Sequence, residues 1–444
     1  MDWQKNVLLA GILATLLFLV IRWNEYQEQA VVTTTPATQS ATASVSETPA
    51  TTTTASEIPT ASAESVPAQT TTPVATDLIN VTTDSLHVRI NPQGGDIVGI
   101  SLPRHHAKLN ATDQPFVLLD ERDGHTYVAQ SGLIGVNGTD SAQGRPTFRV
   151  EKTDFTLENG QDQLVVDLVL DQGDVTITKR FTFTRGDYLI KLDYVINNKG
   201  TSPWSAQLYG QIKRDNHNFV KVSAFEMNPF LGVAITTTEE NYKKMTFSDV
   251  DEQEFRTSRQ GGWVAMVQHY FISAWIPNQT QDNSYSLRKL GNNNLYLFGF
   301  AGPVEQVAPG AEGTISASFY AGPKDTERLS QISPYLDLTV DYGWLWWLSK
   351  PLFSVMKFIH SFVGNWGLAI IGLIVLVKLL FFKLSATSYK SMAKMRKLAP
   401  KMAELKERYG EDRQKFSQEM MKMYKTEQVN PFGGCLPLLI QMPV

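Results

Sequence analysis

Apolar and polar side chains alternate over the middle of the chain, from about Leu78 to Tyr320. The period of two is regular in Leu164 to Leu170, Val175 to Phe183 and Tyr188 to Ile196, and it predicts strands with one buried face. Turn signals rich in glycine separate these runs. The pattern predicts one large antiparallel β-sandwich, with a short helix near Lys324 to Ser333.

Two other segments are apolar without alternation, and they predict membrane helices. Val7 to Ile21 carries no charge, and Asn6 to Trp23 approaches the roughly 20 residues that cross a bilayer. The second segment is Trp366 to Phe382. A cleaved signal peptide is the alternative for the first segment, but no small-x-small cleavage pattern directly follows it. We expect an uncleaved signal anchor at 6–23.

Uneven charge sets the expected orientation of these helices. The segment from Lys383 to Glu427 has nine Lys and three Arg against five Glu and one Asp, a net +6, whereas the rest of the chain carries −10. Positive charge gathers on the cytoplasmic side of membrane helices, so Lys383 to Glu427 is expected there. With two crossings the N-terminus is also cytoplasmic, and Asn24 to Asn365 lies on the far side.

The segment before the second apolar helix has the spacing of an amphipathic helix. One face is polar, with Lys350, Ser354, Lys357 and Ser361, and the other is apolar, with Leu352, Val355, Met356, Ile359 and Val363. The leading tryptophans, Trp344, Trp346 and Trp347, suit the headgroup level of a membrane. We expect a helix lying in the membrane interface, the alternative being an ordinary surface helix.

The remaining segments offer little chemistry. Val31 to Ala75 is dominated by Thr, Ala, Ser and Pro and predicts a disordered tether. The single Cys435 excludes an intrachain disulfide. His105 and His106 point to opposite faces of a strand, so we interpret them as surface residues. The acidic cluster Asp120, Glu121 and Asp123 is typical of a solvated turn.

No motif for metal hydrolysis, nucleophilic catalysis or phosphate binding occurs in the sequence. We therefore expect no enzyme activity, no metal and no cofactor. Because large β-sandwiches also bind sugars, a membrane-anchored carbohydrate-binding protein is the competing hypothesis. It leaves the basic segment unexplained.

Lys378 is a lone cation in the second apolar segment, about one turn from its basic end. Its ammonium either snorkels to the headgroups or lies in a wet cavity open to the cytoplasm, where it would attract acidic groups of a passing polypeptide. The residue alone leaves both readings open.

Two helices are expected after this segment, Ser385 to Tyr409 and Asp412 to Glu427. Each has an apolar stripe, formed by Met392, Met395, Leu398, Met402 and Leu405 on the first and by Phe416, Met420 and Met423 on the second. A helical hairpin would bury one stripe against the other. The methionines either fill gaps in its core or form an adaptable surface for clients. The basic outer face suits anionic lipid headgroups or ribosomal RNA.

Three sequence runs stand out in the second half of the chain: Gly364 to Trp366 (GNW), Ser391 to Arg396 (SMAKMR) and Asn430 to Pro443 (NPFGGCLPLLIQMP). They resemble the YidC family of bacterial membrane protein insertases. Leu336 to Trp347 and Gly262 to Pro277 resemble the Gram-negative branch, so the resemblance covers nearly the whole chain. Family members continue through further spans, so this sequence is expected to be a fragment.

The resemblance implies an insertase and chaperone for membrane proteins that needs no ATP and acts alone or with the Sec translocon. It implies a hydrophilic groove whose basic residue, usually Arg, falls on Lys378. Lysine keeps the charge but lacks the bidentate fork of arginine. The implied partners are nascent membrane proteins, the Sec translocon, anionic lipid, and a ribosome or targeting receptor, with no specific DNA. For the hairpin we predict client or ribosome docking at Met392, Lys394, Met395, Arg396, Met402 and Met420.

The expected fold class is a multi-pass protein of the bacterial inner membrane, with α-helical spans, a large periplasmic antiparallel β-sandwich (supersandwich) and a cytoplasmic helical hairpin. The expected order is a cytoplasmic N-terminus (1–5), signal anchor (6–23), tether (24–76), periplasmic β-sandwich (77–335), interfacial helix (343–363), transmembrane helix (364–382), hairpin (383–429) and the start of another membrane segment (430–444).

Overall fold

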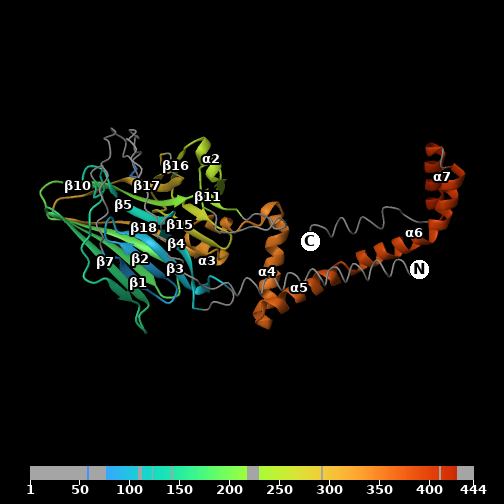
Figure 1. Cartoon of the computed structure of the whole chain (residues 1–444), viewed down its shortest axis with the longest axis horizontal. Helices are drawn as coiled ribbons and strands as arrows, with labels where there is room; N and C mark the ends of the chain where they lie inside the picture. The colour runs from blue at the N-terminus through green and yellow to red at the C-terminus, as the bar shows by residue number, and fades with distance from the viewer. Residues whose placement is uncertain are drawn as a thin grey trace, which may run out of the picture. The chain divides into compact units, whose positions relative to one another are not determined.

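The computed structural model describes residues 58–59, 77–108, 113–122, 124–141, 144–217, 230–291, 294–409 and 412–427. All of them belong to one of the two compact units of the chain, Thr54–Val444. Within these ranges, strands β1–β18 form a β-domain and helices α4–α7 follow it in the sequence (Figure 1). The predicted anchor, and the predicted tether apart from 58–59, lie outside the described residues.

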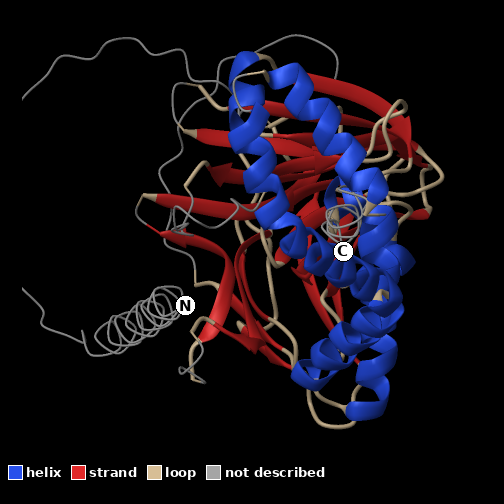
Figure 2. Ribbon diagram, turned by 90° about the vertical axis from the view of Figure 1, so that its right-hand side faces the viewer, coloured by secondary structure: helices blue, strands red, loops and turns tan. Residues whose placement is uncertain are grey.

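Two sheets make up the β-domain, drawn in red in Figure 2. Neighbouring strands are antiparallel except for the parallel pair β1–β6. The ten-stranded sheet has the order β13 (Phe255–Gln260), β16 (Asp282–Lys289), β17 (Leu295–Val307), β10 (Trp204–Asp215), β5 (His125–Ile134), β4 (Pro115–Arg122), β3 (Asp96–His106), β2 (His87–Asn91), β1 (Ile79–Thr82), β6 (Asp154–Thr156). The eight-stranded sheet has the order β12 (Lys243–Met245), β11 (Gly232–Ile235), β14 (Val264–Val267), β15 (Phe271–Ile276), β18 (Glu312–Pro323), β9 (Leu189–Asn198), β8 (Val175–Thr184), β7 (Gln163–Gln172).

The alternation that predicted the strands is the alternation that builds the core. In the β8–β9 pair, Ile177 lies opposite Ile196 and Phe181 lies opposite Leu192, and all four side chains are at most 1% exposed. The predicted short helix is α3 (Thr326–Ile332), which follows α2 (Phe247–Glu252) and precedes the 3₁₀ turn η1 (Leu336–Thr339). The predicted large antiparallel β-sandwich is confirmed.

Close aromatic packing joins the two sheets. The indole Nε1 of Trp275, on β15, donates to the carbonyl oxygen of Gln211 on β10, at 3.1 Å. A Cβ atom at Gly210, which precedes Gln211, would lie 2.8 Å from that indole ring, so position 210 needs glycine. A second link joins the hydroxyls of Tyr127 and Ser273, whose oxygens are 2.5 Å apart. The sheets therefore meet at hydrogen bonds as well as apolar contacts.

A largely buried cation, Arg145, supports this core; its side chain is 15% exposed. The guanidinium of Arg145 pairs with Asp96 and with Asp140, where Nε and Oδ2 are 2.7 Å apart. The hydroxyl of Tyr209 also donates to Asp140, at 2.6 Å. Burial acts to lower the pKa of Arg145, but the two carboxylates outweigh burial and hold the pKa well above its ordinary value. Removing this cation would leave two buried carboxylates unpaired.

Lys179 is a second buried cation, and it lies on the core face of β8. Its ammonium donates to the carbonyl oxygens of Gly94 and Ser131, each at 2.9 Å. Burial lowers the pKa of Lys179 to about 7, although Asp96 acts in the opposite direction. Arg145 also donates to the same two carbonyl oxygens, at 3.4 and 2.8 Å. Lys179 is thus the more dispensable of the two cations.

Two interpretations of polar residues are corrected by the fold. Asp120 does not lie on a solvated turn: it is 7% exposed near the end of β4 and pairs with Arg89 at 2.5 Å and with Arg122. His105 is half-buried rather than a surface residue, since its Nε2 lies 3.2 Å from the hydroxyl of Tyr188. His106 is exposed, as expected. Asp123 lies outside the described residues.

The two buried cations predict unequal effects of substitution. Arg145→Met should lower the free energy of unfolding by about 3 to 5 kcal/mol, because two buried carboxylates lose their partner. Lys179→Met should change it by less than about 1.5 kcal/mol, because Arg145 still satisfies both carbonyl oxygens. Urea unfolding of both variants at pH 7 measures this difference.

The pH dependence of stability gives a second readout, which compares Lys179→Met with the parent protein. The pKa of Lys179 is lower in the folded chain than its ordinary 10.5, so the unfolded chain binds more protons between those values. The parent should therefore gain stability relative to Lys179→Met as the pH rises from about 7 to about 9, by up to ~1.4 kcal/mol per pH unit. Parallel stability profiles of the two proteins over this range would contradict the prediction.

Candidate functional site

The candidate site lies in the four helices that follow the β-domain in the sequence. Helix α4 (Trp346–Val363) is preceded by the 3₁₀ turn η2 (Gly343–Leu345) and ends at Gly364, whose φ is +63°. Asn365 then caps α5 (Trp366–Leu380) by accepting a hydrogen bond from the backbone N–H of Leu368, at 3.1 Å. The left-handed glycine ends one helix and the asparagine begins the next, so GNW forms a sharp helical corner.

Side-chain contacts fix this corner. The ring of His360 stacks on Trp366 with 3.9 Å between centroids. A Cβ atom at Gly372 would lie 3.3 Å from Cγ2 of Ile359, so α4 and α5 approach closely there. On the polar face of α4, Lys357 pairs with Glu327 of α3 at 2.6 Å. Helix α4 is therefore held on one side by α5 and on the other by an ion pair.

Helix α4 presents large aromatic groups outward. Trp346 and Trp347 are 61% and 58% exposed, and Phe358 and Phe362 are 64% and 75% exposed. Val363, predicted on the apolar face, is also exposed. Exposed aromatic side chains on this scale mark an interaction surface. They fit the predicted interfacial position of the helix, which stays a prediction.

Helix α5 is apolar on every side except at Lys378, in its last turn, and is covered by little of the described protein. Leu368, Ile371, Ile374, Leu379 and Leu380 are all more than half exposed. An α-helix with no polar face needs an apolar environment, either a protein core or a lipid bilayer. The described residues do not provide that core.

The second predicted span is broken. Helix α5 ends at Leu380 and α6 (Phe382–Tyr409) begins two residues later, with a bend of 61° between them. Among the described helices, none is by itself long and apolar enough to cross a membrane, whereas α5 and α6 together meet that criterion. The bend lies inside the predicted span 364–382, which the chain does not form as one straight helix.

Lys378 lies in the last turn of α5, and its side chain is exposed. A cation at this end of a helix interacts favourably with the helix dipole. Among the described residues, no carboxylate lies within ion-pair distance of its ammonium. Within the described residues, its charge therefore has no ion-pair partner.

The predicted hairpin forms between α6 and α7 (Arg413–Thr426). Leu398 is 5% exposed, and Met395, Met402 and Leu405 are half-buried on the same stripe. Phe416, Met420 and Met423 are half-buried on α7, which begins at the capping residue Asp412. The two predicted stripes thus make the hairpin core, except that Met392 is 39% exposed.

Two contacts of the hairpin were not predicted from the sequence. The hydroxyl of Tyr424 contacts the sulfur of Met402 at 3.6 Å, and Lys401 pairs with Glu427 at 2.5 Å. Tyr424 lies four residues after Met420, so helical spacing could have predicted that it lies on the same face. The sequence could not predict the ion pair, because it depends on how the two helices align.

The structure does not bring all predicted site residues together. Met395, Met402 and Met420 lie in or beside the hairpin core, whereas Met392, Lys394 and Arg396 are exposed on α6. No described contact joins Lys378 to this group. Nor do the described residues contain a cluster of three or more His, Cys, Asp or Glu side chains that could hold a metal ion. The described site therefore consists of exposed positive charge and exposed apolar side chains.

A large β-sandwich, an outward-facing aromatic helix, a predominantly apolar helix and a basic hairpin together indicate a membrane protein with a domain outside the bilayer. The model of a family described as "YidC periplasmic domain" matches residues 78–355, and that of "60Kd inner membrane protein" matches residues 358–444. The chain belongs to the YidC family, and the resemblance found in its sequence is confirmed.

Individual relatives agree with this assignment. A protein of Cellvibrio japonicus named "Membrane protein insertase YidC" is 66% identical over 453 residues, covering 100% of this chain and 80% of the relative. A protein of the same name from Saccharophagus degradans is 50% identical over 457 residues, covering 100% and 81%.

Solved structures are more distant. The "Active YidC insertase crystal structure with the first transmembrane domain resolved" is 16% identical, with a TM-score of 0.31, covering 84% of this chain and 70% of that one. A galactose mutarotase-like protein from Lactobacillus casei is 11% identical, with a TM-score of 0.37, covering 55% and 99%. At such TM-scores the family assignment rests on the sequence relatives.

Proposed function

We propose that this chain is a membrane protein insertase and chaperone of the bacterial inner membrane, with its β-domain in the periplasm. The observation that carries the proposal is the apolar helix α5, whose one cation, Lys378, has no carboxylate partner among the described residues and which leads into a basic amphipathic hairpin. The names of the relatives support it. Insertion by such a site needs no bond chemistry, so we also propose that the chain is not an enzyme.

The proposed topology follows from charge and hydrophobicity. The anchor at 6–23 and the broken segment α5–α6 cross or enter the bilayer, and the hairpin lies in the cytoplasm, where the positive-inside bias places it. Helix α4 lies in the periplasmic interface with its exposed tryptophans at headgroup level. The ion pair of Lys357 with Glu327 then connects the interfacial helix to the β-domain.

Lys378 is proposed to lower the barrier for hydrophilic client segments. Insertion scales assign about 2.5 to 3.5 kcal/mol to one charged residue at the centre of a membrane helix. A wet groove shortens the dry path, and a fixed ammonium adds attraction for client carboxylates. At an effective dielectric constant of about 20, a pair about 4 Å apart gains on the order of 4 kcal/mol before desolvation is subtracted. The net gain is smaller, which lets the client leave.

The hairpin is proposed to dock the ribosome, the targeting receptor or the incoming client. Lys394 and Arg396 are exposed on α6, outside the packed stripe, so they are available for phosphate groups of RNA or of anionic lipid. The exposed Met392 lies on the same helix and offers an adaptable apolar contact. The Sec translocon is proposed as a partner on the basis of the family resemblance alone.

The carbohydrate-binding alternative has one structural observation in its favour. A pocket with many amide and hydroxyl groups lies on the ten-stranded sheet. A sugar-binding role, however, leaves α5, Lys378 and the hairpin without a function. The insertase proposal accounts for all three.

Depletion of the protein in its host tests the overall proposal. Small clients with short translocated segments, such as phage-coat-like or ATP-synthase-subunit-like proteins, should accumulate uninserted within a few cell generations. Protease accessibility of a periplasmic tag measures their insertion. Normal insertion after complete depletion would refute the proposal.

Substitutions at Lys378 test the electrostatic mechanism. Lys378→Arg should retain activity because the charge remains, whereas Lys378→Ala should slow the insertion of clients with acidic translocated segments. Lys378→Glu should slow them most, because attraction becomes repulsion. The matched control is the same client with its acidic residues replaced by Asn or Gln, which should be nearly insensitive to all three variants. Equal insertion of acidic clients by every variant would make Lys378 a snorkelling residue.

Charge removal on α6 tests docking without disturbing the fold of the hairpin. The double variant Lys394→Gln/Arg396→Gln should reduce the rate of client insertion severalfold, because both side chains are exposed. The control is Lys422→Gln/Lys425→Gln on α7, which removes the same charge from exposed positions and should change the rate less than twofold. Equal effects of the two double variants would show that insertion depends only on the net charge of the hairpin. The hairpin would then set the topology and would not be a docking site.

A further inference from the structure

The ten-stranded sheet carries a pocket of about 510 Å³. On β16, the pocket residues Ser284, Ser286 and Arg288 alternate with the core residues Tyr285 and Leu287. Since successive side chains of a strand point to opposite faces, the first three point away from the core. The pocket therefore lies on the outer face of the sheet, and none of its residues belongs to the helical site.

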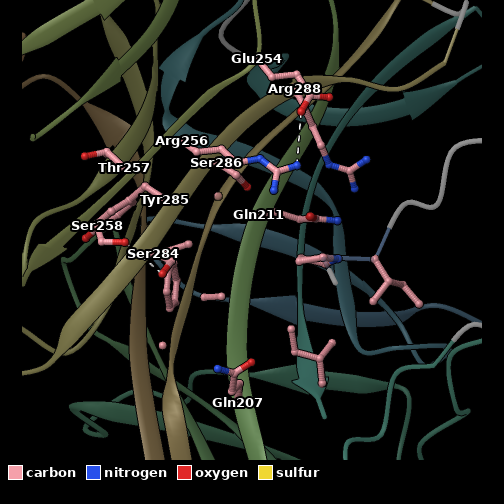
Figure 3. A pocket seen from close by; sticks show the side chains of 17 residues that line it. Gln207, Gln211, Glu254, Arg256, Thr257, Ser258, Ser284, Tyr285, Ser286 and Arg288 are labelled. Carbon is pink, nitrogen blue, oxygen red and sulfur yellow. Dashed lines mark hydrogen bonds and ion pairs between the residues drawn. The ribbon is translucent and has the colours of Figure 1, made fainter. Parts of the chain in front are cut away.

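Amide and hydroxyl side chains line this pocket. Figure 3 shows Gln207 and Gln211 from β10, Ser284 and Ser286 from β16, and Ser258 from β13 around one space. The hydroxyl oxygens of Ser258 and Ser284 are 3.3 Å apart. Such groups both donate and accept hydrogen bonds, so they suit the N–H and C=O groups of an extended peptide.

Gln211 is held in place by its partner on the neighbouring strand β5. It is 4% exposed, and its Nε2 donates to Oε1 of Gln130 at 2.9 Å. Gln130 in turn donates to Asp96 at 3.0 Å, and Asp96 pairs with Arg145. A polar side chain that is buried and fixed by a buried network is the mark of a built site rather than of an accidental surface hollow.

One wall of the pocket comes from a distant part of the sequence. Ile58 and Pro59 line the pocket together with the strands, and both are half-buried. A residue before proline favours extended backbone, so Ile-Pro is preset for lying along a sheet. Arg256 and Arg288 also line the pocket, together with Glu254, which pairs with Arg256 at 3.3 Å. The backbone preference of Ile58–Pro59 therefore suits this position along the sheet.

We propose that the pocket is a docking site for the chain's own tether and that Ile58–Pro59 is the docked segment. With the anchor proposed at 6–23, docking would shorten the free tether before the domain from residues 24–76 to residues 24–57. At roughly 3.4 Å per residue, its maximum reach falls from about 180 Å to about 115 Å. Docking thus limits how far the β-domain can move from the membrane.

Weak affinity is sufficient for this contact because the tether is covalently attached. A flexible linker gives an effective concentration on the order of millimolar. A segment with a dissociation constant of about 0.1 mM would then be docked about nine-tenths of the time, so a group beneath it would be shielded about tenfold.

Thiol protection in the full-length chain tests the proposal. In a Cys435→Ser background, Ser286→Cys places one thiol in the pocket, and its rate of alkylation by a maleimide is measured with and without Ile58→Asp/Pro59→Ser. The tether substitutions should raise the rate about tenfold, because a charged segment leaves the pocket. They lie outside every strand, and unchanged urea unfolding will verify that the domain is intact.

Three controls make the result specific. A thiol at the exposed Thr201 should react at the same rate with either tether. Adding a synthetic peptide of residues 54–63 to the substituted protein should restore protection, and a scrambled peptide should not. Protection should not change on dilution of the protein. Equal rates at Ser286→Cys with both tethers would overturn the proposal, and protection lost on dilution would assign the pocket to the tether of a second copy.

Discussion

Burial of apolar side chains between two sheets is the interaction on which the β-domain depends. The chain has one cysteine, Cys435, so no intrachain disulfide can hold a domain of this size together. The core must do so alone, and it does so with strands such as β8 and β9, whose inward residues are completely buried. The aromatic residues that join the sheets, Trp275 and Tyr127, also use their polar atoms across the gap.

Two cations in this core are compensated by different groups. Arg145 is compensated by two carboxylates, and Lys179 by two backbone carbonyl oxygens and a pKa near neutrality. The same network continues through Asp96 and Gln130 to Gln211, which reaches the pocket on the outer face. Through this network, the buried charges also position Gln211, which forms part of the surface pocket.

Sequence periodicity predicted the kinds of element well, because a sandwich strand and an amphipathic helix impose their period directly on side-chain polarity. The period of two also places Lys179 on the core face of its strand, between Ile177 and Phe181. Because lysine is polar, the sequence alone did not identify it as a core residue. Periodicity could not give the strand order, the bend after Leu380 or the pairing of Lys401 with Glu427, since these depend on contacts between segments. The contact of Ile58–Pro59 with the sheet is of the same kind.

Two lysines in apolar surroundings show how the protein separates structure from function. Lys179 is enclosed, its ammonium is fixed by carbonyl oxygens, and nothing from outside can reach it. Lys378 also follows a run of apolar residues, but its side chain is exposed and no described carboxylate neutralises it. Because the ammonium of Lys179 is already bonded to two carbonyl oxygens inside the core, it cannot bind a client without breaking those contacts. Lys378, at the end of an apolar helix, has no carboxylate partner among the described residues and contributes little to the fold. Its charge therefore remains available to bind a client.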